Sequence, residues 1–184
     1  MADSPDHRGS SDFVGLLDAA EVLGGFAWTE RCLFQFVGSW SASCSSPEMA
    51  IVLADHARRH AWHSQLWFDR LPELSVVDAE SLVASPSEGV TQVFRTMDES
   101  GDDLTRLVGV YRVMCPHLLS TYDAEIARFG DVAAPSVRRW ATFIRGDLIE
   151  QWLWGESRIR SLAVDEATVD LAIEGQRSFE RHLV

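Results

Sequence analysis

Apolar residues recur at intervals of three and four along most of this chain, and strict alternation of apolar and polar positions persists nowhere. The first spacing follows one face of an α-helix, which turns about 100° per residue, whereas alternation is typical of a strand. We therefore predict an all-α fold without strands. The predicted helices cover residues 18–40, 47–71, 86–97, 104–129, 135–162 and 165–182.

Polar residues and prolines mark the expected ends of these helices. Ser46 precedes Pro47, the order of an N-cap followed by proline in the first turn. Asp18 and Ser85 each stand three residues before a glutamate, which is the spacing of a capping box. Pro116 lies inside a predicted helix, where it has no N–H to donate, so we expect a kink there.

The four long helices form two pairs. The loops within each pair are short, whereas residues 72–103 separate the pairs. This is the layout of an up-down four-helix bundle with one long crossover, here carrying a short helix and followed by an extra C-terminal helix. At 184 residues the chain is expected to form a single domain over residues 13–184, after a polar tail, residues 1–12, that we expect to be disordered.

Composition and charge narrow the classes of function. The net charge of −12 disfavours nucleic acid and anionic membranes as partners. No apolar run reaches the roughly 18 residues of a membrane span, and the N-terminus lacks the apolar core of a signal peptide. The three cysteines show no C-x-x-C spacing and are expected to be free thiols of a cytoplasmic protein. Lysine and asparagine are both absent, which indicates a GC-rich bacterial gene.

The most informative polar residues are three histidines in the second predicted helix. His56, His60 and His63 stand at offsets of four and three, so all three lie on the side of the helix that carries its apolar stripe. Polar groups on a core-facing stripe need partners. Glu30 in the first helix and Glu125 in the third lie beside inward-facing residues. These five residues are the candidate metal ligands, and we expect Glu30, His60 and Glu125 to converge at the centre of the bundle.

The layout and these positions resemble the ferritin-like superfamily over roughly residues 18–162. In di-iron members, two helices each supply a glutamate and the other two each supply Glu-x-x-His. This chain departs from that pattern. Ala57 stands three residues before His60, and the fourth long helix has no histidine, while its Asp147 is expected to point away from the apolar stripe. The resemblance therefore implies a ferritin-like bundle with a degenerate or single-metal site, for iron, manganese or zinc.

Two functional hypotheses remain open. In the first, the chain is an oxidase- or hydroxylase-like metal enzyme to which Asp147 or Glu156 adds a carboxylate. In the second, it binds no metal, and a buried Glu/His hydrogen-bond network stabilises a ligand-binding or protein-interaction module. Tryptophans near the inward stripes either fill the core or line a cavity for a small apolar ligand. Trp62 and Trp154 lie off the stripes and suggest a homodimer interface. A haem-oxygenase-like or thiaminase-like bundle is the alternative fold.

Overall fold

The computed structural model describes residues 15–73, 77–129 and 134–183, and these ranges contain helices and no strand, which confirms the all-α prediction. The predicted tail, residues 1–12, lies outside the described residues. The helices in chain order are α1 (Leu16–Ser41), α2 (Pro47–Phe68), α3 (Ala79–Leu82), α4 (Glu88–Glu99), α5 (Asp103–Leu107), the π-helix η1 (Val108–Met114), α6 (Cys115–Ile126), α7 (Ala134–Leu162) and α8 (Glu166–Glu180).

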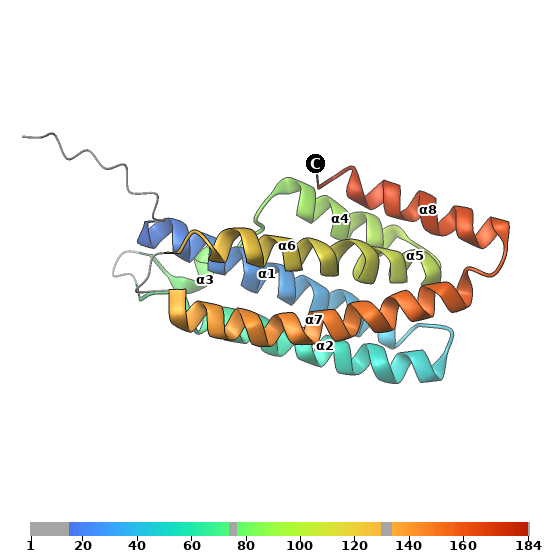
Figure 1. Ribbon diagram of the computed structural model, residues 1–184, viewed down its shortest axis with the longest axis horizontal. Coiled ribbons are helices and arrows are strands. Elements are labelled where there is room, and N and C mark those ends of the chain that lie inside the picture. The colour runs from blue at the N-terminus through green and yellow to red at the C-terminus, as the bar shows by residue number, and fades with distance from the viewer. Residues whose placement is uncertain (1–14, 74–76, 130–133, 184) are drawn as a thin grey trace, which may run out of the picture.

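The longest segments, α1, α2, α5–η1–α6 and α7, lie alongside one another (Figure 1). The helix α1 packs along α2, and α6 and η1 pack along α7, which also contacts α2. The segments α2 and α5–η1–α6 run in the same direction, because the connection between them returns along the molecule through α4 (Figure 1). The crossover thus contains the predicted short helix, and also α3, which the sequence did not predict. The final helix α8 packs against α4, α5 and η1.

Side-chain caps account for where several helices begin. The Ser46 hydroxyl accepts a hydrogen bond from a backbone N–H of the first turn of α2, as predicted. Ser87, not Ser85, caps α4, because the Ser85 hydroxyl donates instead to the carbonyl of Ser87. The capping box predicted at Asp18 is also wrong. The helix α1 begins before Asp18, whose carboxylate lies in the first turn, where the helix dipole favours a negative charge.

The segment around Pro116 departs from α-helical geometry. The seven residues Val108–Met114 form a π-helix directly before the α-helix that holds the proline. A proline ring crowds the carbonyl four residues earlier and donates no hydrogen bond, and the wider π-turn relieves both problems. The apolar stripe predicted for this segment is nevertheless buried along its whole length: Leu104, Leu107, Tyr111, Cys115, Leu118, Tyr122, Ile126 and Phe129.

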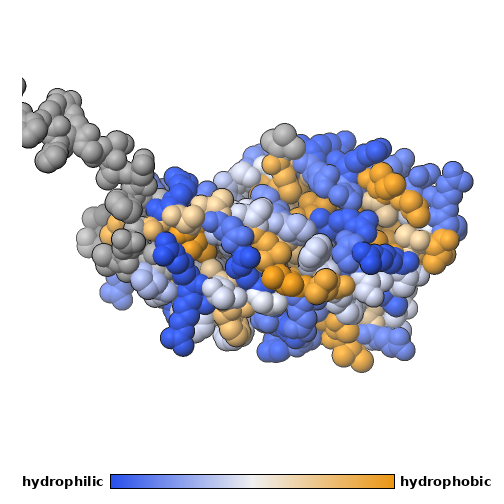
Figure 2. Space-filling view, in the orientation of Figure 1, coloured by the Kyte–Doolittle hydropathy of each residue, from blue (hydrophilic) through white to orange (hydrophobic). Residues whose placement is uncertain are grey.

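The surface mixes polar and apolar side chains, and Figure 2 shows hydrophobic residues scattered among hydrophilic ones on the face in view. Several of the exposed apolar side chains belong to α7 and α8, among them Phe143, Leu153 and Leu171. Within the described ranges, no helix combines the length with the apolar character that a bilayer span requires.

Candidate metal centre

Glu30 of α1 and His60 and His63 of α2 meet in the interior of the protein. Each of the three is 0% exposed. Their candidate ligand atoms all lie within 4.8 Å of one another. The two histidines are three residues apart, close to one helical turn, so both can face the neighbouring helix α1. The structure therefore brings together three of the five residues that the sequence singled out.

The carboxylate of Glu30 is held from two sides. Its Oε2 lies 2.5 Å from His60 Nδ1 and 3.5 Å from His63 Nδ1. Its Oε1 accepts a 2.7 Å hydrogen bond from the Tyr122 hydroxyl of α6. That hydroxyl in turn accepts a 3.1 Å bond from Trp67 Nε1. Because both oxygens are engaged, the carboxylate is fixed between α2 and α6.

Burial and the neighbouring charges shift the pKa values of Glu30 and His63 in opposite directions. Burial alone would raise the pKa of Glu30, but the adjacent His63 and His60 outweigh it and hold that pKa well below its usual range. Burial alone would lower the pKa of His63, whereas Glu30 and Asp147 raise it above its ordinary value. Glu30 is therefore ionised at neutral pH, and His63 retains its proton to a higher pH than an ordinary histidine.

The hydrogen bonds of the two imidazoles leave one nitrogen of each without a partner. Among the described residues, nothing hydrogen-bonds to His60 Nε2 or His63 Nδ1. The other nitrogen of His63, Nε2, lies 3.0 Å from Asp147 Oδ2 of α7. A metal-binding histidine usually presents one nitrogen to the ion and donates its other N–H to a carboxylate. His63 has this arrangement, with Nδ1 on the side of Glu30.

The spacing of the donor atoms also fits an ion. Two ligand atoms at right angles on an ion about 2.1 Å away are roughly 3 Å apart. Glu30 Oε2 and the unpartnered His63 Nδ1 are 3.5 Å apart, close to this distance, whereas His60 Nδ1 makes a direct 2.5 Å contact with Glu30 Oε2. Asp147, expected to point away from the apolar stripe, instead supports His63, and it does so from a continuous α-helix without local distortion. The residues present therefore fit a metal ion.

His56 lies outside this group, in an aromatic environment. Its Nδ1 is 2.8 Å from the Tyr111 hydroxyl, and the Trp154 ring meets it edge-on with centroids 5.1 Å apart. Burial first, and then the nearby charges of His60 and Arg59, lower the pKa of His56 to about 3. His56 is therefore a neutral ring at physiological pH.

Glu125 also lies away from the group, so the expected convergence of Glu30, His60 and Glu125 does not occur. The Glu125 carboxylate pairs at 2.5 Å with Arg128, which lies just past the end of α6, and stays partly exposed. A second buried carboxylate beside Glu30 would be destabilised by charge repulsion as well as by the cost of burial. At the edge of the stripe, the Glu125 carboxylate is stabilised by Arg128 and by solvent. Glu156, the other carboxylate considered, binds Arg112 through two hydrogen bonds of 2.7 and 2.9 Å.

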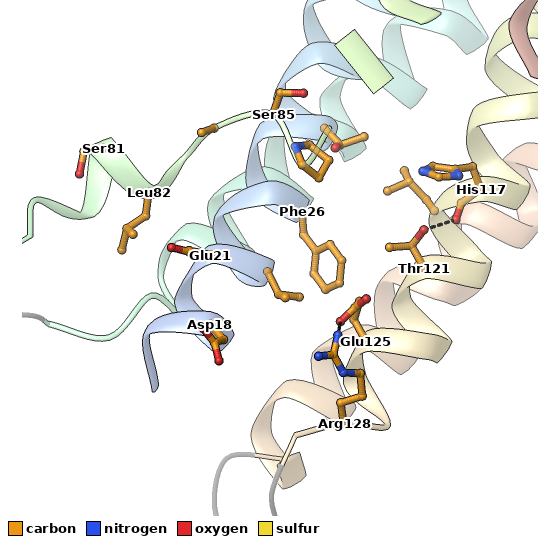
Figure 3. A pocket seen from close by; sticks show the side chains of 15 residues that line it. Asp18, Glu21, Phe26, Ser81, Leu82, Ser85, His117, Thr121, Glu125 and Arg128 are labelled. Atoms are coloured by element: carbon orange, nitrogen blue, oxygen red, sulfur yellow. Dashed lines mark hydrogen bonds and ion pairs between the residues drawn. The ribbon is translucent and has the colours of Figure 1, made fainter. Parts of the chain in front are cut away.

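A cleft of about 580 Å³ opens between α1, α6 and residues 81–86 of the crossover (Figure 3). Glu125 and Arg128 lie at its edge, and the largely buried Phe26 ring forms part of its wall (Figure 3). The Phe26 ring also packs edge-on against Tyr122, with centroids 4.6 Å apart. One aromatic ring therefore separates the cleft from the hydrogen bond between Tyr122 and Glu30.

Comparisons with protein-family models, with curated proteins and with solved structures each found no match to this chain. The ferritin-like relationship accordingly stays a prediction. The chemistry of the site has to be inferred from its own donor atoms, their burial and their partners.

Proposed function

We propose that this chain is a ferritin-like helical protein that binds one divalent transition-metal ion through Glu30, His60 and His63. The observation that carries the proposal is the complete burial of one carboxylate and two imidazoles whose donor atoms lie within 4.8 Å of one another. Two histidines and one carboxylate are the donor set of mononuclear non-haem iron(II) sites, and of some zinc sites. We therefore expect the site to hold iron first, and manganese or zinc next.

The charges favour one ion over two. A dinuclear carboxylate site uses four carboxylates, whereas Glu30 is the one fully buried carboxylate among the described residues. Asp147 adds a second negative charge next to His63. Together these two carboxylates balance the charge of a single dication with neutral imidazoles, and a second dication would be left without compensation.

The arrangement of the helices supports the ferritin-like part of the proposal. The pairs α1–α2 and α6–α7, joined by a long crossover that lets α2 and α5–η1–α6 run in the same direction, have the layout that the resemblance implies. The candidate site also lies between the helices of such a bundle, where bundles commonly hold metals.

The proposed reaction class is oxidation or hydroxylation of an organic substrate. A redox-active ion at this site would supply the oxygen-activating chemistry. The residues of the chain have distinct tasks. Glu30, His60 and His63 would bind the ion. Asp147 orients His63 through Nε2, and the Tyr122 hydroxyl fixes the carboxylate of Glu30. The complete burial of Glu30, His60 and His63 keeps bulk water away from the donor atoms.

A metal-free hydrogen-bond network is the competing function for the same residues. The short contact between Glu30 and His60 and the bond from Tyr122 favour it, because they already satisfy both carboxylate oxygens without an ion. In that case Glu30 and the histidines stabilise the helices, and the chain serves as a binding module.

Titration with Co²⁺, followed by its visible ligand-field absorption, separates the two functions. Chelator-treated protein should bind about one Co²⁺ per chain saturably. Glu30→Gln or His63→Ala should weaken binding at least about 100-fold, and Asp147→Asn about 10- to 100-fold, because a carboxylate that accepts the other N–H of a metal-bound histidine contributes that much. Glu125→Gln is the matched control and should bind like the wild type. Absence of saturable binding, or equal binding by Glu30→Gln, would favour the metal-free network.

A further inference from the structure

The cleft between α1, α6 and residues 81–86 has the size of a small-molecule site. Its volume of about 580 Å³ falls within the roughly 300–1,000 Å³ of typical ligand pockets. Val22 and Phe26 of α1, Leu118 of α6 and Pro86 of the crossover supply an apolar lining. Phe26 and Leu118 are packed into the core, so this part of the surface is preformed. An apolar ligand body would bury its surface here without requiring the helices to move.

The charged residues that line the cleft are mostly acidic. Asp18 and Glu21 come from α1 and Glu125 from α6, against a single guanidinium, that of Arg128 (Figure 3). Arg128 is paired with Glu125. His117 adds no positive charge at neutral pH, since burial lowers its pKa. Three carboxylates and one guanidinium leave a net charge of −2 around an apolar floor.

We propose that this cleft binds a small amphiphilic organic cation, whose apolar body lies against the accessible side chains of Val22, Leu82 and Pro86 and whose ammonium group faces the carboxylates of Asp18 and Glu21. A cation is favoured because it gains from the acidic rim, whereas an anion of the same shape is repelled. This places the small ligand of the chain in a lateral cleft instead of the bundle core. Binding requires no metal ion, so the proposal stands independently of the metal centre.

The position of the cleft gives such a ligand access to the neighbourhood of the buried group. Phe26 touches the cleft on one side and Tyr122 on the other. Thr29, which also lines the cleft, directly precedes Glu30 in α1. If the metal centre acts on an organic substrate, the cleft is where that substrate would bind, with the Phe26 ring as the barrier between them.

Isothermal titration calorimetry with three ligands of one shape tests the charge preference. Hexylammonium, hexanol and hexanoate are titrated into the chelator-treated full chain at low salt. Hexylammonium should bind at least tenfold more tightly than hexanol, and hexanoate more weakly than both. The double variant Asp18→Asn/Glu21→Gln should reduce the preference for hexylammonium to less than threefold and leave hexanol binding unchanged. The control Glu166→Gln/Asp170→Asn makes the same charge change on exposed positions of α8 and should keep the full preference.

A second variant tests the location. Thr121 lines the cleft from α6, so Thr121→Trp should fill it and remove binding of both hexylammonium and hexanol, with circular dichroism confirming that the helices are retained. The proposal is overturned by equal affinity for hexylammonium and hexanol, which would indicate a site for neutral apolar molecules. It is also overturned by a preference for hexanoate, by absence of binding, or by unchanged binding in the folded Thr121→Trp variant.

Discussion

Replacement of His56 by glutamine should make the folding stability of this protein less sensitive to acid. His56 is 4% exposed, and its Nδ1 contacts the Tyr111 hydroxyl at 2.8 Å. Burial, followed by the charges of His60 and Arg59, lowers its pKa to about 3, whereas a histidine in an unfolded chain titrates near 6.5. The unfolded chain therefore takes up this proton first as the pH falls. The stability contributed by the neutral ring is complete above about pH 6.5 and is lost as the pH falls toward 3.

The size of the effect follows from the difference between the two pKa values. When the pH falls from 7 to 5, the titration of His56 should lower the unfolding free energy of the wild type by about 2 kcal/mol. In this range the pH lies well above the folded pKa, so the loss is set by the unfolded pKa. A change of the folded pKa by one would alter the result by only about 0.05 kcal/mol.

Urea unfolding followed by tryptophan fluorescence at pH 7, 6 and 5 measures the effect. The wild type should lose about 2 kcal/mol more than His56→Gln between pH 7 and pH 5, with glutamine still able to accept the Tyr111 hydrogen bond. Tyr111→Phe is the matched control, because it removes the hydrogen bond but keeps the titrating ring, and its pH dependence should follow the wild type. Equal losses in the wild type and His56→Gln would refute the reasoning.

The remaining predictions concern packing and buried polar groups, and urea unfolding at pH 7 measures them all. Gly155→Ala would place its methyl carbon 2.2 Å from Tyr111 Cβ and should cost about 1–3 kcal/mol, whereas Gly146→Ala meets no atom within 4 Å and should gain about 1 kcal/mol of helix propensity. Equal stability of these two variants would contradict the packing described. The Gln151 amide is buried without a hydrogen-bond partner among the described residues, so Gln151→Met should stabilise the metal-free protein by about 1 kcal/mol, and Thr105→Val should do so by less. Destabilisation by Gln151→Met would show that the amide binds a partner in solution.

The helical content and most helix positions were predictable, because the signals for them are local in the sequence. Each long helix buries most of the apolar stripe visible in its sequence. Ser46 caps α2 by accepting a hydrogen bond from the backbone N–H of Met49, only three residues away in the chain. The π-helix before Pro116 was not predictable in the same way. The proline signals only that regular hydrogen bonding must break, and the three- and four-residue spacing of the buried stripe is that of an ordinary α-helix, which gives no sign of the wider π-turn.

The site was predictable only in part, because its contacts are between helices. Glu30 and His60 lie at the interface of two consecutive helices, α1 and α2. Their inward positions in the sequence were enough to predict that they meet. Asp147 was considered as an added carboxylate, but its contact with His63 could not be predicted, because that contact depends on how α7 packs beside α2. For Glu125 a local signal existed. Arg128 stands three residues later, within the helix predicted over residues 104–129, a spacing that favours an ion pair at the surface.

The metal-to-chain ratio tests the central claim most directly. Protein purified without chelators and dialysed anaerobically against Fe²⁺ is analysed by inductively coupled plasma mass spectrometry, beside folded Glu30→Gln and His60→Ala variants. We expect about one ion per chain in the wild type and almost none in either variant. A small fraction of an ion per chain in the wild type, or the same content in all three proteins, would contradict binding by these residues.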